Sequence, residues 1–121
     1  MHEMSIAQSL LDIIRDEMEK NQLKVLFKVK VKTGKLNAIV PDALTFCFDL
    51  LLRDTPWEGA ILEIETVPVR LKCVECGYEF YPPIEENVVS IFSIPCPSCG
   101  ADFGHRVLEG KELLIEYIEG E

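Results

Sequence analysis

The 121-residue sequence predicts an α+β protein in which a small helix-plus-sheet domain carries an inserted, zinc-ribbon-like module of four cysteines. Three observations support this fold class. Two segments place apolar residues at helical spacing, three segments alternate apolar and polar residues, and two Cys-x-x-Cys pairs stand late in the chain. We expect the first domain to comprise residues 1–69 plus 111–121, and the cysteine module to comprise residues 70–110.

Residues 5–20 are predicted to form an amphipathic helix. Ser5 and Gln8 match a capping box, in which two side chains bond to free backbone amides of the first turn. Charged residues lie on one side of the expected helix, and apolar residues recur on the other side at helical spacing. The apolar residues are Ile6, Leu10, Ile13, Ile14 and Met18. The first three residues therefore precede the expected helix and are predicted to be exposed.

Residues 23–32 alternate so regularly that they predict a strand with one buried face and one lysine face. The residues expected on the buried face are Val25, Phe27, Val29 and Val31. The residues expected on the exposed face are Lys24, Lys28, Lys30 and Lys32.

A second helix is predicted to begin near Pro41, because proline suits the first turn of a helix. Asp42 lies in the same turn, where the positive end of the helix dipole favours a carboxylate. Cys47 lies in an apolar run and is expected to pack in the core. The buried side is expected to comprise Leu44, Phe48, Leu51 and Leu52, and the segment 54–56 to end the helix.

Two more strands are expected on either side of the cysteine module. Alternation predicts one strand from Ala60 to about Val69, and another after Gly110, in which Leu113, Ile115 and Tyr117 share a face. We expect the last strand to return to the first sheet.

The cysteine pairs are Cys73 with Cys76 and Cys96 with Cys99, separated by 19 residues. Each Cys-x-x-Cys turn directs two thiolates at one ion, so two such turns form a closed tetrahedral S4 site. Gly77 and Gly100 follow the pairs and are expected to adopt positive φ around the sulfurs. Thiolate sites of this kind select zinc, or iron in electron-transfer proteins, and both pairs resemble the knuckles of rubredoxins. We expect structural zinc.

Composition limits the possible functions. The formal net charge of −9 disfavours binding to nucleic acid, and no apolar run is long enough to cross a membrane. No signal peptide is recognised, which, with cysteines in metal-site spacing, predicts a cytoplasmic protein. The sequence contains neither a paired nucleophile and base nor a phosphate-binding loop, so we expect no enzyme. Hairpins and loops are expected for residues 77–95, and a surface or hinge role is expected for His105.

His2 stands beside the α-amine of Met1. An amine, deprotonated backbone amides and an imidazole can form the square-planar ligand set that Ni(II) and Cu(II) accept. Glu3 could add a carboxylate ligand or a hydrogen bond to a ligand.

The opening residues Met1 through Ala7, the segment Gly34-Lys35-Leu36, the helix from Pro41 through Phe48 and the paired cysteines together resemble the HypA family of nickel-insertion accessory proteins. The resemblance implies a nickel metallochaperone of [NiFe] hydrogenase maturation. It implies transient Ni(2+) on His2, with Met1 and Glu3 as accessory ligands and Asp42 as a weaker candidate, and structural Zn(2+) on the four cysteines.

The implied partners are a HypB-type GTPase, the [NiFe] hydrogenase large subunit and a possible second copy of the chain. Two alternatives remain open at this point. One is a rubredoxin-like electron carrier with iron in the S4 site, and the other is a zinc-ribbon adaptor that binds a protein.

Overall fold

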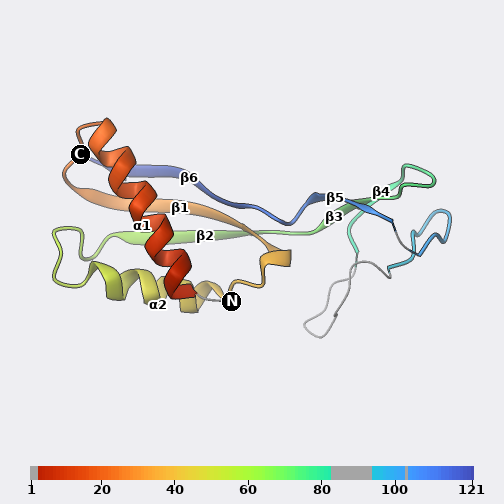
Figure 1. Ribbon diagram of the computed structural model, residues 1–121, viewed down its shortest axis with the longest axis horizontal. Helices are drawn as coiled ribbons and strands as arrows, with labels where there is room; N and C mark the ends of the chain where they lie inside the picture. Colours follow the sequence, from red (N-terminus) through yellow and green to blue (C-terminus); the bar gives the residue numbers. More distant parts are fainter. Residues whose placement is uncertain (1–2, 83–93, 103) are drawn as a thin grey trace.

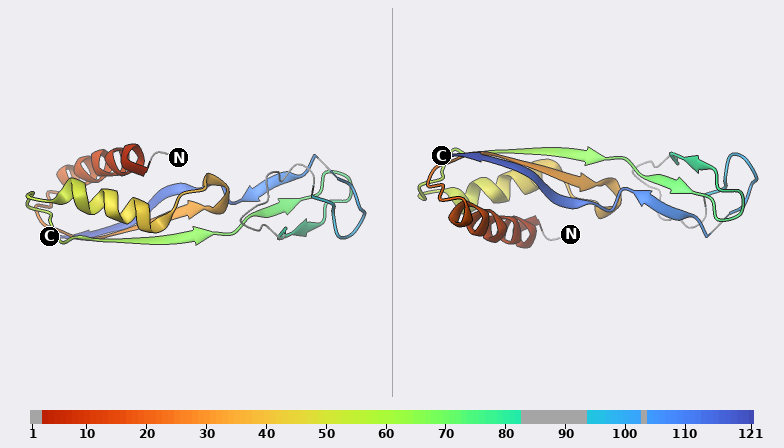
Figure 2. Two further views of the ribbon diagram at one scale, coloured as in Figure 1. Left: turned by 90° about the horizontal axis from the view of Figure 1, so that it is seen from below. Right: turned by 90° about the horizontal axis from the view of Figure 1, so that it is seen from above.

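The structure is a computed structural model that describes residues 3–82, 94–102 and 104–121. Its first region is a three-stranded sheet in the order β2-β1-β6, and helices α1 and α2 cover the same face of this sheet (Figures 1 and 2). The elements of this region are α1 (Glu3–Lys20), β1 (Leu26–Gly34), a 3-10 turn (Lys35–Asn37), α2 (Pro41–Leu52), β2 (Ile61–Val67) and β6 (Leu113–Gly120).

The second region is a smaller sheet in the order β4-β3-β5 at the other end of an elongated molecule (Figure 1). Its strands are β3 (Arg70–Lys72), β4 (Glu79–Phe80) and β5 (Arg106–Glu109). The mixture of helices and sheets confirms the predicted α+β class. Among the described residues, neither helix is long and apolar enough to cross a lipid bilayer.

The first sheet is built around β1. β2 pairs with β1 in parallel, with α2 as the crossover between them, and β6 pairs with the other side of β1 in antiparallel orientation. The last strand therefore returns to the first sheet, as predicted.

One predicted strand is two strands in the structure. The alternation from Ala60 to Val69 predicts a single element, but β2 ends at Val67 and β3 begins at Arg70 in the other sheet. Pro68 lies between them and has no backbone N–H, so the pairing with β1 cannot continue through it. Arg70 instead pairs with Glu109 of β5.

The main core lies between the helices and the sheet. Phe48, Leu44 and Leu52 of α2 are buried against the apolar side of α1, as the helical spacing predicts. Cys47 is half-buried and packs against this core, as expected.

The start of α1 differs from the prediction. The helix already includes Glu3, so Ser5 is a helical residue and is not the N-cap of a capping box. The prediction that Glu3 precedes the helix is also wrong. Met1 and His2 lie outside the described residues.

A β-bulge changes which residues of β1 are buried. Leu26 pairs with Gly120 and Lys28 with Glu119, so Phe27 is an extra residue on β1. The extra residue shifts the alternation, and Leu26 is buried while Phe27 is 47% exposed. The prediction that Val25 and Phe27 are buried is therefore wrong, whereas Val29 and Val31 are buried as predicted.

A second bulge lies in β6. Lys30 pairs with Tyr117 and Val31 with Ile115, which leaves Glu116 as the extra residue. Because of this bulge, Ile118 rather than Tyr117 packs against the core after Ile115. Tyr117 is therefore exposed on the lysine face rather than aligned with Ile115 as predicted, and the Lys28 ammonium lies 5.8 Å from the centre of its ring.

The lysine face of the sheet is a network of ion pairs. Lys28 Nζ lies 2.6 Å from Glu63 Oε2, and Lys30 Nζ lies 3.3 Å from Glu63 Oε1. Lys32 lies 3.7 Å from Glu65 and 3.6 Å from Glu116. Since glutamates of both neighbouring strands flank the lysines, the open face carries little uncompensated charge.

The two sheets meet at a tight backbone contact. A Cβ atom on Gly34 would overlap the carbonyl of Gly110, so the position requires glycine. Next to it, the Leu36 amide donates to the Gly110 carbonyl at 2.9 Å, and the Asn37 side chain donates to the Glu112 carbonyl at 2.5 Å. Leu36 also packs against the small core of the second region.

Candidate metal centre

Two turns of the same design present the four cysteines. In the first, the Gly77 amide donates to the Cys73 carbonyl and the Cys73 amide to the Tyr78 carbonyl, both at 2.9 Å. In the second, the same two bonds join Gly100 to Cys96 and Cys96 to Ala101, again at 2.9 Å. Gly77 has φ of 77° and Gly100 has φ of 79°, which confirms the predicted positive φ after each pair.

The turns place the four sulfurs around one point. All four Sγ atoms lie within 4.8 Å of one another, and the distances from Cys73 to Cys99 and from Cys76 to Cys96 are 3.6 Å. These distances are too long for disulfides, which join sulfurs about 2 Å apart. Four sulfurs held about 2.3 Å from one ion at tetrahedral angles stand about 3.8 Å apart. The four cysteines are thus positioned to bind one metal ion.

The electrostatics of the cluster also favour a cation. Burial raises the pKa of the Cys96 thiol, but hydrogen bonds from the backbone amides of Cys99 and Ser98 outweigh it and lower the pKa to about 6. The Ala101 amide lowers the pKa of Cys99, whereas its contact with Cys73 Sγ and burial raise it, to about 12 overall. Since neighbouring thiolates repel one another, a divalent cation between them would let all four deprotonate.

The cluster is half enclosed. Cys73 and Cys96 are buried, whereas Cys76 and Cys99 are exposed at the end of the molecule. A ligand set of four thiolates leaves no position for a substrate or a water molecule on the metal. The arrangement therefore suits a metal that holds the module together.

His105 is part of the same module but is absent from the cluster of possible metal ligands among the described residues. Its Nε2 lies 2.6 Å from the carbonyl oxygen of Ile94, and its ring packs edge-on against Phe80. The ring is half-buried, and the expected surface or hinge role of His105 stays a prediction. No sequence signal shows this contact, since Phe80 and His105 lie far apart in the chain.

Of the residues expected to bind nickel, the structure describes Glu3 and Asp42, which lie in the first turns of α1 and α2 in the first region. Met1 and His2 are outside the described residues. Glu3 opens α1, and its Oε2 lies 3.5 Å from the amide of Val40, which caps α2. Asp42 is exposed in the first turn of α2. The structure thus brings Glu3 next to the beginning of α2, which carries Asp42.

Comparisons with known proteins match the chain along its whole length. The model of the family described as "Hydrogenase/urease nickel incorporation, metallochaperone, hypA" matches residues 1–120. The chain is 46% identical over 119 residues to hydrogenase maturation factor HypA of Solidesulfovibrio magneticus, with 98% of each chain covered. It is 45% identical over 121 residues to the factor of the same name of Lawsonia intracellularis, with 100% of each chain covered.

Solved structures share the fold. A structure described as the solution structure of HypA protein superposes with a TM-score of 0.69 at 23% identity, covering 99% of this chain and 96% of that one. The solution structure of the Ni metallochaperone HypA from Helicobacter pylori superposes with a TM-score of 0.65 at the same identity, covering 99% and 97%. With the family model matched from residue 1 to residue 120, the chain belongs to the HypA family of hydrogenase and urease nickel-incorporation metallochaperones.

Proposed function

We propose that this chain binds Ni(II) at its N-terminus and delivers it to the large subunit of a [NiFe] hydrogenase, together with a HypB-type GTPase. The observation that carries the proposal is the extent of the family match, which includes both the opening residues and the four cysteines. Relatives that cover 98% and 100% of this chain are themselves named hydrogenase maturation factors. We place the protein in the cytoplasm, where cysteines remain reduced and available to metals.

The proposed nickel ligand is His2, assisted by the Met1 amine and Glu3, with Asp42 as a weaker candidate. Glu3 lies near the positive end of α2 as well as that of its own helix, and these two ends repel a cation. Anionic ligands such as a carboxylate and deprotonated amides offset this repulsion. A site at the end of the chain can also exchange its ligands one at a time, as a delivery protein requires.

We propose zinc for the four cysteines, with a structural role in a module comprising residues 70–110. The geometry of the four sulfurs supports a tetrahedral ion but would also accept iron. Metal analysis of the purified protein separates these possibilities. One equivalent of zinc in colourless protein supports the proposal, and a red, redox-active protein would replace it with an iron electron carrier.

The nickel site is tested by titrating the His2→Ala variant with Ni(II). Calorimetry and the d–d absorption of a square-planar complex monitor the titration. We expect the variant to lose stoichiometric nickel binding and to keep its zinc, because the two metals use separate ligands. His105→Asn is the matched control, since it removes the other of the two histidines.

Two results would contradict the assignment. Nickel binding by His2→Ala with wild-type stoichiometry would exclude His2 as the main ligand, and loss of binding only in the His105 variant would move the site to the cysteine module. Absence of nickel binding in the wild type would favour a zinc-ribbon adaptor.

A second measurement tests the amine. Addition of Gly-Ser before Met1 removes the amine from its place beside His2, and we expect nickel affinity to fall. Affinity in the unmodified protein should also fall as pH decreases from 8 to 6, because protons compete for the imidazole and the amine.

A further inference from the structure

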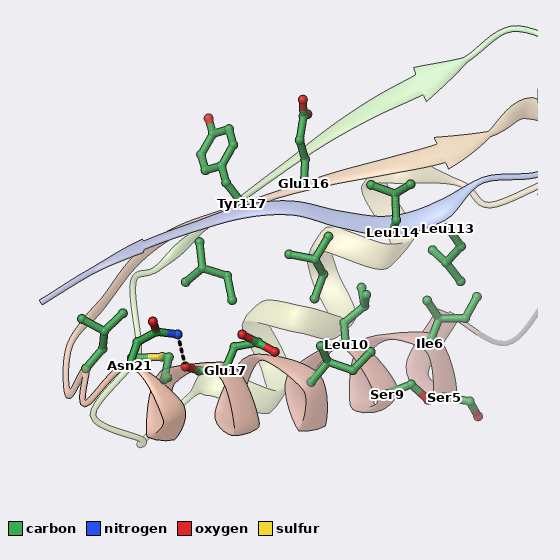
Figure 3. Close-up of a pocket in the computed structure, with 15 residues that line it drawn as sticks. Ser5, Ile6, Ser9, Leu10, Glu17, Asn21, Leu113, Leu114, Glu116 and Tyr117 are labelled. Atoms are coloured by element: carbon green, nitrogen blue, oxygen red, sulfur yellow. Dashed lines mark hydrogen bonds between the residues drawn. The ribbon is translucent and has the colours of Figure 1, made fainter.

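A groove of about 980 Å³ runs between α1 and β6 (Figure 3). Leu10, Ile13 and Met18 are among the α1 residues that line it, and on the other side it is lined by every residue from 113 to 118. None of these residues is an expected ligand of nickel or zinc. The groove is therefore separate from both proposed metal sites.

The groove is open to the main chain of β6. Successive side chains of a strand point to opposite faces of the sheet, so a cavity on one face touches only alternate residues. A cavity lined by six consecutive residues must extend to the edge of the strand. β6 is an edge strand, because the described part of the sheet has the order β2-β1-β6 and pairs β6 with β1 alone.

Apolar side chains are exposed along this edge. Ile13 is 51% exposed, Leu113 46%, Leu114 43% and Tyr117 39%. Natural edge strands are usually blocked by proline, lysine or bulges, because an open edge pairs with other chains. β6 has neither proline nor lysine, and the bulge at Glu116 lies in its pairing with β1.

The charged residues at the groove are acidic. Glu17 lines it from α1 and Glu116 lines it from β6, and Glu119 follows in the same strand. Pairing of β6 with β6 of a second copy would bring the glutamates of both copies together, in addition to two formal charges of −9. Glu116 already lies 3.6 Å from Lys32 and Glu17 lies 3.8 Å from Lys20, whereas Glu119 has no ion pair among the described residues. Glu119 and the net charge of −9 favour a basic occupant, which would share the carboxylates of Glu116 and Glu17 with these lysines.

We propose that the free edge of β6 binds an extended segment of a partner protein that alternates apolar side chains with lysine or arginine, and that this segment adds a fourth strand to the sheet. Main-chain hydrogen bonds provide the pairing, and the two faces of the sheet provide the selectivity. On the helix side, apolar side chains of the segment contact Ile13 and its neighbours. On the other side, where Glu116 and Tyr117 point away from α1 in Figure 3, basic side chains contact the carboxylate and the ring.

One end of the groove lies near the beginning of α1. Ser5 and Ile6 line that end together with Leu113 and Leu114. Ser5 is two residues along the chain from Glu3. A segment bound along β6 would therefore position its own protein close to the residues that we propose bind nickel, although its binding does not require nickel.

The experiment uses a fluorescein-labelled, capped peptide of four Val-Lys repeats as the probe and measures its fluorescence anisotropy with the full-length protein. We expect a Kd below about 1 mM. The same peptide N-methylated at every backbone amide keeps its side chains but cannot pair as a strand, and it should not bind. A Val-Glu peptide of the same length should not bind either. Hydrogen exchange should slow along β6 in the presence of the Val-Lys peptide.

Two pairs of variants locate the site. Ile13→Glu should weaken binding about tenfold, because it replaces an apolar contact, whereas Phe46→Glu makes the same change on the outside of α2, beyond the groove, and should have no effect. Glu116→Lys should weaken binding about fivefold by reversing a cross-strand charge. Glu65→Lys changes the net charge equally and removes another partner of Lys32, but on β2, and should have no effect.

Several outcomes would overturn the proposal. One is binding of the N-methylated peptide as tight as that of the unmodified Val-Lys peptide. Another is a loss of affinity in Phe46→Glu or Glu65→Lys as large as in Ile13→Glu or Glu116→Lys. A third is no change in the anisotropy of the Val-Lys peptide at protein concentrations up to about 1 mM. Protection of β6 that rises with protein concentration, without peptide, would identify a second copy as the occupant. Nickel titrations of Ile13→Glu should match those of the wild type, so failure here leaves the proposed function intact, and loss of nickel in His2→Ala leaves this proposal intact.

Discussion

The two sheets of this protein are stabilised in different ways. In the described residues, the core beneath α1 and α2 contains thirteen buried residues, all apolar, whereas the core of the cysteine region contains five, of which two are Cys73 and Cys96. Burial of apolar surface can hold the first region together. The second has too small a core to fold without a staple.

This difference separates two uses of metal in one chain. A proposed zinc ion at the cysteines would be part of the fold, because its ligands are also core residues. Glu3 and Asp42, the described residues proposed to assist nickel binding, are not among the buried core residues, so we expect the fold not to depend on nickel. Under the proposed function, the same chain would keep one metal and transfer another.

The largest effect that tests this comparison is expected from Cys96→Ser. Structural zinc sites contribute on the order of 10 kcal/mol of apparent folding free energy, so loss of one ligand should release the metal and unfold β3, β4 and β5. Hydrogen exchange should show lost protection in those strands and retained protection in β1. Metal analysis should show loss of zinc.

The matched control is Cys47→Ser, which removes the one cysteine outside the cluster. It should keep its zinc. Equal unfolding of both sheets in Cys96→Ser would show that the first region also depends on the metal for its stability.

An intermediate effect is expected from Phe48→Ala in α2. The side chain is fully buried beneath the helices, and its truncation should lower the free energy of unfolding by about 3–5 kcal/mol. Denaturant unfolding measures this loss. Zinc content should not change, because the metal is held by the other region.

Phe46 provides the control, since it is 64% exposed on the same helix and Phe46→Ala should change stability little. Release of zinc by Phe48→Ala under native conditions would mean that the first core also supports the metal centre.

The smallest effect concerns the ion pairs on the open face of the first sheet. Hydrogen bonds from Lys28 and then Lys30 lower the pKa of Glu63 below its ordinary value of 4.5. A carboxylate with a lowered pKa stabilises the folded state above its unfolded pKa, and the contribution is lost as pH falls through the folded value. Glu63→Gln should therefore be slightly less stable than the wild type at pH 7, and the difference should shrink below pH 4.5.

Thermal unfolding at a series of pH values measures this change, with Glu119→Gln in β6 as the control. A difference between Glu63→Gln and the wild type that stays constant from pH 7 to pH 3 would show that the lysine pairs do not affect stability through this carboxylate.

Much of this fold could be predicted from local patterns. The helical spacing around Phe48 places α2 correctly, and the spacing of the cysteines predicts a cluster that the structure confirms. Positive φ at Gly77 and Gly100 follows from the geometry of the turns. In each case the signal is a short local pattern, although the cysteine cluster itself joins two pairs separated by 19 residues.

The wrong predictions concern residues whose burial is determined by pairing between segments that are distant in the chain. Bulges at Phe27 and Glu116 depend on the registers of β1 and β6, so alternation alone assigns Phe27 and Tyr117 to the wrong face. The groove beside β6 was missed for the same reason, since it requires α1 and the last strand to be placed side by side. The N-terminal nickel ligands stay a prediction that rests on chemistry and on resemblance.

The pairing of Arg70 with Glu109 has a practical consequence. The two ends of the cysteine region leave and re-enter the first sheet side by side, as the ends of a hairpin do. The region should therefore behave as an exchangeable cassette: a short turn in place of residues 71–108 would close the chain without shifting the register of β2 or β6.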